Sequence, residues 1–68
     1  MKVTKDSVIG ELLAQDMQIA AVLMNSGMHC VGCPASQMES LEEACMVHGM
    51  DVTEVVDSIN NYLETGNI

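Results

Sequence analysis

The sequence contains no arginine and two lysines against ten acidic residues, which gives a net charge of −8. A chain with so few cations cannot neutralise a row of phosphates, so nucleic acid is excluded as a general partner. The same negative field repels anionic membrane surfaces and favours cationic patches on a partner protein. Charge therefore indicates how a partner would be attracted, and says nothing about chemistry.

Phenylalanine and tryptophan are absent and there is a single tyrosine, whereas methionine occurs seven times. We therefore expect methionine and aliphatic side chains to fill an aromatic-poor core. Sixty-eight residues, 49% of them hydrophobic, allow one small domain over residues 1–68. A domain of this size buries only about 60% of the surface of its unfolded chain, so a homodimer that covers one face is an alternative to the monomer.

No long uninterrupted apolar run is present. The uncharged stretch from Met17 to Met38 is broken by polar residues, glycine and proline, so it is not expected to span a membrane. Residues 1–6 lack the apolar core of a secretory signal, which predicts a cytoplasmic protein. Because thiols are kept reduced there, three cysteines indicate reactive, metal-binding or buried thiols rather than a fixed disulfide framework.

Hydrophobic periodicity predicts a compact all-α domain with four short helices, near residues 7–14, 16–26, 34–48 and 52–65. Val3 is expected to add at most a short extended piece, and one strand cannot make a sheet. The second helix is nearly apolar all round and is expected to be central. Its predicted buried stripe consists of Met17, Ala20, Ala21 and Met24, widened by Ile19, Val22 and Leu23. The predicted buried side of the third helix consists of Met38, Leu41, Cys45 and His48.

Glycine followed by methionine occurs at 27–28 and 49–50, each time at the end of a predicted helix. Glycine fits the left-handed position just past a helix end because it has no Cβ. In the Schellman motif that results, the first methionine is expected to fold back on Leu23 and the second to cover Cys45.

The third and fourth helices carry start signals. Pro34 suits the first helical position of the third helix, and Ser36 with Glu39 forms the pattern of a capping box. Asp51 with Glu54 gives the same pattern at the start of the fourth helix. These signals place a loop between the second and third helices.

That loop contains Cys30 and Cys33 in a Cys-x-x-Cys spacing. Two cysteines at this spacing can form a disulfide or bind a soft metal together. If Pro34 is the first helical residue, Cys33 is the N-cap, where backbone amides and the helix dipole favour the thiolate. Cys30 is then the resolving partner, and His29 is the one nearby cation when protonated, so it acts as a modulator.

Three interpretations of the cysteine pair stay open: a redox-active dithiol, a metal or iron–sulfur site, and inert loop cysteines. A metal site needs more ligands than Cys30, Cys33 and at most His29 supply. A continuous third helix would hold Cys45 about 18 Å from Cys33, too far for shared coordination or a disulfide. A homodimer would supply four cysteines, so zinc or an iron–sulfur cluster bridging two chains is the metal alternative. The loop also resembles that of copper chaperones, whose sheet this chain cannot build.

Elsewhere the residues favour structural roles. Cys45 is expected to be a small buried hydrophobe, and His48 is expected to meet the negative end of the dipole of the third helix. A non-catalytic interaction module that uses an acidic, methionine-rich surface is the remaining alternative to a redox or metal function. We find no Ser-His-Asp set, no paired carboxylates for acid–base catalysis and no phosphate-binding loop in the sequence.

Three runs carry a family resemblance: GMHCVGCP at 27–34, ESLEEA at 39–44 and HG at 48–49. The chain resembles the hybrid-cluster-protein-associated redox disulfide domain, a small domain of unknown function, over nearly its whole length, from VIGELL at 8–13 to NNYL at 60–63. It is similar, more loosely, to the N-terminal domain of iron–sulfur repair proteins. The resemblance implies a multihelical fold, a redox pair and an association with iron and nitrogen-oxide metabolism.

We therefore expect Cys30 and Cys33, the pair that the resemblance implies, to cycle between dithiol and disulfide. Electrons would pass to or from a protein redox partner through a mixed disulfide at Cys33, without a bound cofactor.

Overall fold

The computed structural model describes residues 2–28 and 37–66, and within them the chain forms four helices and no strand. The helices are α1 (Ile9–Gln15), α2 (Ile19–Asn25), α4 (Leu41–His48) and α5 (Val52–Thr65). The prediction of one small all-α domain is confirmed.

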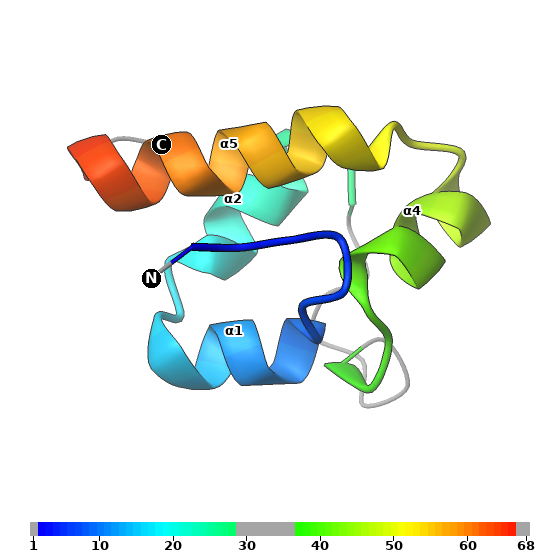
Figure 1. Ribbon diagram of the computed structural model, residues 1–68, viewed down its shortest axis with the longest axis horizontal. Helices are drawn as coiled ribbons and strands as arrows, with labels where there is room; N and C mark the ends of the chain where they lie inside the picture. The colour runs from blue at the N-terminus through cyan, green and yellow to red at the C-terminus, as the bar shows by residue number, and fades with distance from the viewer. Residues whose placement is uncertain (1, 29–36, 67–68) are drawn as a thin grey trace.

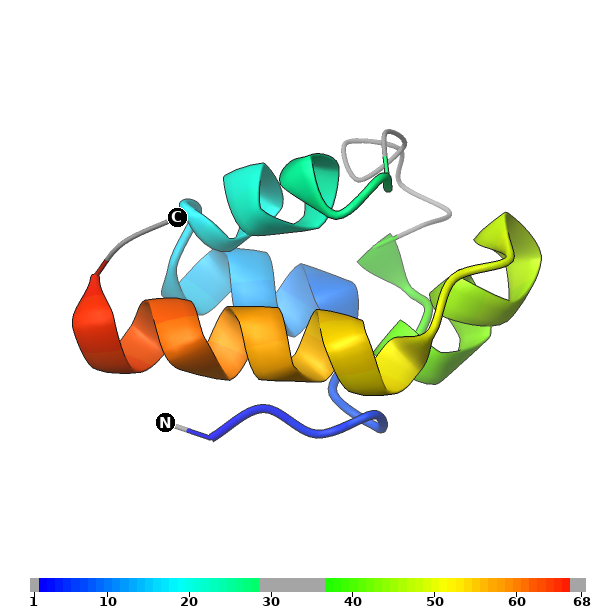
Figure 2. The ribbon, with the colours of Figure 1, turned by 90° about the horizontal axis from the view of Figure 1, so that it is seen from above.

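The helices and the N-terminal segment surround a common core (Figure 1). In that view α5 lies above and α1 below, while α4 closes one end. The view from above adds that α2 lies behind α5 and the N-terminal segment lies in front of it (Figure 2). α5 packs against both α2 and α4, and α1 packs against α2.

Start and stop signals at both ends explain why α5 begins and ends as predicted. The carboxylate of Asp51 accepts the backbone N–H of Thr53 at 2.9 Å, rather than completing the predicted box with Glu54. Gly66 ends the helix in the left-handed conformation, with φ at 76°. Between these ends the helix buries Val55 and Ile59, one turn apart on the inner side.

The core of the described residues contains no aromatic ring and no buried polar or charged side chain. Its buried members are Val3, Ile9, Leu12, Ile19, Val22, Leu23, Met28, Leu41, Ala44, Cys45, Val55 and Ile59. Branched aliphatic side chains dominate it, and one methionine, one alanine and one cysteine complete it. Most of the methionines are therefore not core residues, contrary to the expectation from composition.

The N-terminal segment is fixed to α5 by a paired contact. Val3 is buried, and its N–H donates to Oδ1 of Asn60 at 2.8 Å. Nδ2 of Asn60 donates back to the carbonyl of Val3 at 3.0 Å. The amide side chain thus satisfies both backbone groups as a neighbouring strand would, which allows an extended segment to be buried without a sheet.

The prediction of one continuous helix over 34–48 is wrong, because the described part of that range leaves helical geometry before Leu41. Ser40 has an extended backbone, with φ at −75° and ψ at 164°, and forms an isolated antiparallel bridge with Val8. Backbone groups that a continuous helix would bond internally are thus bonded to residues 5–9, which lie before and at the start of α1.

Ser36, which was predicted to form a capping box with Glu39, lies outside the described residues. The start of α4 has a capping box of its own. It is formed by Ser40 and Glu43. Oγ of Ser40 accepts the N–H of Glu43 at 3.2 Å, and the carboxylate of Glu43 accepts the N–H of Ser40 at 3.0 Å. The pattern S-x-x-E occurs at both positions, so the local pattern alone could not distinguish them.

The first two helices begin later than predicted. α1 begins at Ile9, and Val8 at its N-cap makes no side-chain capping bond. α2 begins at Ile19, because the carboxylate of Asp16 accepts the N–H of Gln18 at 3.0 Å and holds the preceding residues in a turn. That turn places Met17 outside the helix, where its side chain is 77% exposed.

The buried faces of α2 and α4 also differ from the predicted stripes. α2 buries Ile19, Val22 and Leu23, and α4 buries Leu41, Ala44 and Cys45. Met24 and Met38, predicted to be buried, are exposed, and so is His48. Met38 lies before the observed start of α4, whereas Met24 and His48 lie within their helices but away from the buried face.

Candidate functional site

The predicted site residues His29, Cys30 and Cys33 lie outside the described residues, as does Pro34. Their assignment as redox pair and modulator, or as metal ligands, stays a prediction. The structure does describe the chain on both sides of this segment, up to Met28 and from Gln37 onward. These flanks are the part of the candidate site whose geometry can be given.

The N-terminal flank is firmly attached to the core. Gly27 adopts φ at 110°, and the N–H of Met28 donates to the carbonyl of Leu23 at 3.0 Å. This bond is the one that defines the Schellman motif, so the predicted helix ending is confirmed. Met28 is 1% exposed, which makes it a buried anchor directly before the cysteine segment.

The C-terminal flank is held against the start of α1. The N–H of Ile9 donates to the carbonyl of Glu39 at 3.0 Å, and the N–H of Leu41 donates to the carbonyl of Ser7 at 2.9 Å. Next to this ladder, Gly10 lies so close to Gln37 that an added Cβ would stand 2.7 Å from the carbonyl oxygen. A glycine at this position is what permits the close approach, and the sequence analysis had given it no role.

Cys45, the third cysteine, is free and 1% exposed on the inner face of α4. Burial raises the pKa of its thiol above the ordinary value, and the nearby negative charge of Asp51 raises it further. A buried, protonated thiol is a poor nucleophile. Because the predicted helix over 34–48 is not continuous, helix length does not fix the distance between Cys45 and Cys33. Burial of Cys45 is the observation that speaks against a role in thiol exchange.

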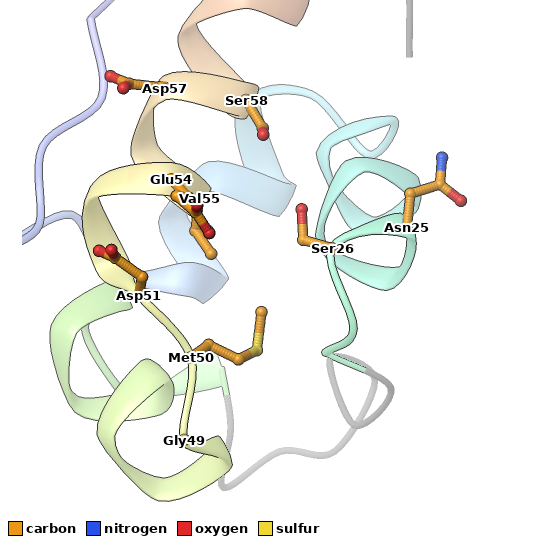
Figure 3. Close-up of a pocket in the computed structure, with 9 residues that line it drawn as sticks. All are labelled: Asn25, Ser26, Gly49, Met50, Asp51, Glu54, Val55, Asp57 and Ser58. Atoms are coloured by element: carbon orange, nitrogen blue, oxygen red, sulfur yellow. The ribbon is translucent and has the colours of Figure 1, made fainter.

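A depression of about 830 Å³ lies between the end of α2, the turn before α5 and the first half of α5. Figure 3 shows Met50 and Ser26 pointing into it from opposite sides, whereas Asp57 points away. The hydroxyl of Ser26 donates to the carbonyl of Val22 at 3.0 Å. The described lining of the depression contains neither histidine nor cysteine.

Neither a metal site nor a membrane-spanning helix is found among the described residues. No three side chains of His, Cys, Asp or Glu among residues 2–28 and 37–66 gather closely enough to hold a metal ion. His48 lies exposed in the last turn of α4, directly before the left-handed Gly49. Even α5, the longest described helix with 14 residues, falls short of the roughly 20 that cross a bilayer.

Together, the four short helices around one aliphatic core define a small all-α domain. A family model described as "Domain of unknown function (DUF1858)" matches residues 3–56. The chain belongs to this family. The resemblance to a small domain of unknown function is thereby confirmed, and no activity follows from it.

A solved structure supports the fold independently. A protein from Clostridium thermocellum, whose solution structure was determined by NMR as a structural genomics target, is 47% identical to this chain. The match covers 97% of this chain and 94% of that one, with a TM-score of 0.85. No curated protein matches the chain.

Proposed function

We propose that the protein is a thiol–disulfide redox module in which Cys30 and Cys33 exchange electrons with a protein partner. The observation that carries the proposal is the Cys-x-x-Cys motif in a segment bounded by two fixed flanks. Met28 on one side is buried, and Glu39 on the other is bonded to α1. Anchored flanks support a reactive pair because they limit how far the two ends of its segment can move apart.

The exchange takes place in two steps. The thiolate of Cys33 attacks one sulfur of a partner disulfide, and the other partner sulfur leaves as a thiolate. The thiolate of Cys30, once its proton has gone to water, then attacks the sulfur of Cys33 and releases the second partner sulfur. The pair has become a disulfide and the partner a dithiol, so two electrons have moved. The reverse sequence oxidises the partner.

The negative charge of the chain argues against strong stabilisation of the thiolate of Cys33. The molecule has a net charge of −8, and one of its two lysines, Lys5, already pairs with Glu42 at 3.4 Å. His29 is the remaining group near the pair in sequence that can become cationic near neutral pH. The proposal places the exchange in a reducing compartment such as the cytoplasm, and it includes the association with iron–sulfur or nitrogen-oxide metabolism that the family resemblance implies.

The first prediction concerns the redox equilibrium of the pair. Alkylation of the chain in glutathione or dithiothreitol buffers, read by mass spectrometry, should give a two-electron midpoint between about −120 and −300 mV, the range of exchange proteins. Cys45 is an internal control, since its buried thiol should be alkylated slowly in the folded protein. A midpoint outside this range would argue against exchange.

Trapping of the mixed disulfide in single variants tests the roles of the two cysteines. Cys30→Ser should prolong the mixed disulfide with a partner because the resolving thiol is missing, whereas Cys33→Ser should abolish it. The opposite result would exchange the two roles. Metal or cluster absorbance at one site per two chains, lost with either cysteine in protein purified without oxygen, would replace the redox proposal by the bridged metal site.

A further inference from the structure

The last turn of α4 exposes two apolar side chains, which is unusual for a helix at the surface. Met46 is 77% exposed and Val47 is 73% exposed. The exposed positions of the neighbouring helix α5 are polar or acidic, as expected for a helix with one face in water. Those positions are Thr53, Glu54, Asp57, Ser58, Asn61, Glu64 and Thr65. Met46 and Val47 therefore add nothing to the core, and polar residues could take their places.

Helical geometry places these two residues next to carboxylates. At 100° per residue, the inner face of α4 carries its buried residues, and the opposite side carries Glu42, Glu43, Met46 and Val47. Three or four residues separate each acid from an apolar neighbour, the spacing at which helical side chains lie side by side. We call these four residues the α4 outer face: its first turn is acidic and its last turn is apolar.

We propose that the α4 outer face is a docking surface for a partner protein that presents an apolar pocket flanked by lysine or arginine. The inference rests on the proposed function and names its partner more closely, as the disulfide-bearing protein. α4 follows directly on the C-terminal flank of the cysteine segment, since Gln37 precedes Leu41 by four residues. A partner seated on α4 is therefore brought next to that flank.

Charge complementarity favours a basic partner over a second copy of this chain. The side chains of Glu42 and Lys5, which form an ion pair, are 43% and 57% exposed. A cation of the partner can therefore replace Lys5 beside Glu42. Two copies that met through this face would oppose two acidic turns on molecules of net charge −8.

The size of the face agrees with a brief encounter. Two apolar side chains and two acids cannot supply the roughly 800 Å² per partner of a standard stable interface. Weak redox encounters bury less than about 1,200 Å² in total. A small apolar centre with charged edges therefore suits a partner that docks, exchanges and leaves.

The test uses an amphipathic helical peptide of leucine and lysine as the probe, titrated into the isotope-labelled full-length chain. Amide shifts in the NMR spectrum should concentrate on residues 42–48. The double variant Met46→Gln and Val47→Gln should weaken binding about tenfold, as removal of an interface anchor does. Met17→Gln is the matched control, because it also removes a 77% exposed methionine and should leave the affinity unchanged.

Three outcomes would overturn the proposal. Shifts spread evenly over all acidic surfaces would mean that charge alone attracts the probe, and an equal loss in Met17→Gln would mean that any exposed methionine serves. Concentration-dependent shifts at 46–47 without peptide would show that the face binds a second copy. The whole titration is repeated on Cys30→Ser with Cys33→Ser, which should bind equally well, so docking and redox exchange succeed or fail independently.

Discussion

At the scale of single residues, the contact between Tyr62 and Asp16 joins distant parts of the chain. The phenol of Tyr62 on α5 donates to Oδ2 of Asp16 at 2.8 Å, in the turn before α2. This hydrogen bond raises the pKa of Tyr62 above its ordinary value, and desolvation and the negative charge of Asp16 raise it further. The folded state therefore holds the phenolic proton more tightly than the unfolded state does.

The stabilisation from this pair should be complete below pH 10.0, the ordinary pKa, and lost as the pH rises through the higher pKa of the folded protein. Ultraviolet titration of tyrosinate measures this directly, because the chain has one tyrosine and no tryptophan. Asp16→Asn should move the midpoint back toward the value in denaturant. A native midpoint equal to the denatured one would show that the bond does not form in solution.

At the scale of elements, the close approach of α1 to the chain before α4 depends on Gly10. A Cβ there would stand 2.7 Å from the carbonyl oxygen of Gln37 and 3.3 Å from its Cβ. The first contact is to backbone, which cannot rotate away as a side chain can, so the two segments would have to separate. Helix propensity acts in the opposite direction, because alanine is favoured over glycine by about 1 kcal/mol inside a helix.

Steric overlap should outweigh propensity, so Gly10→Ala is expected to destabilise the protein by about 1–3 kcal/mol. Urea unfolding followed by circular dichroism measures the change. The exposed Ala14 on the same helix provides the control, since Ala14→Gly should cost about 1 kcal/mol by propensity alone. A gain in stability for Gly10→Ala would mean that the two segments move apart without cost.

The elements also show what the sequence could and could not predict. α5 was predicted with nearly its observed bounds because local signals act at both ends: Asp51 caps its start and Gly66 its end. The start of α4 was not predicted correctly, because the pattern S-x-x-E occurs at both 36–39 and 40–43. Hydrogen bonds to residues 7–9 decide where α4 begins. Tertiary hydrogen bonds to a segment thirty residues away leave no local pattern.

The same division applies to the site. The burial of Cys45 and the Schellman motif that Met28 completes after α2 follow from short-range patterns, and both are confirmed. The α4 outer face was missed because Met46 was not assigned to either face, although apolar residues directly after the buried Cys45 interrupt the helical period and could have indicated it.

At the scale of the whole molecule, charge is the dominant unbalanced feature. The longest extent is 28 Å, and the Debye length is about 30 Å at 0.01 M salt and about 8 Å at 0.15 M. At low salt, therefore, every carboxylate repels every other across the whole molecule, and at moderate salt only near neighbours interact. Screening also weakens the ion pair of Lys5 and Glu42, but an exposed pair is worth at most about 1 kcal/mol.

Relief of repulsion should therefore exceed the loss of that pair, and at pH 7 the thermal midpoint is expected to rise by several degrees between about 0.01 and 0.15 M sodium chloride. Thermal unfolding followed by circular dichroism measures the rise. The control is the same series near pH 4.1, the isoelectric point, where the net charge vanishes and the salt dependence should vanish with it. A midpoint that falls with salt at pH 7 would mean that local attractions, and not the net charge of −8, govern the electrostatics of the fold.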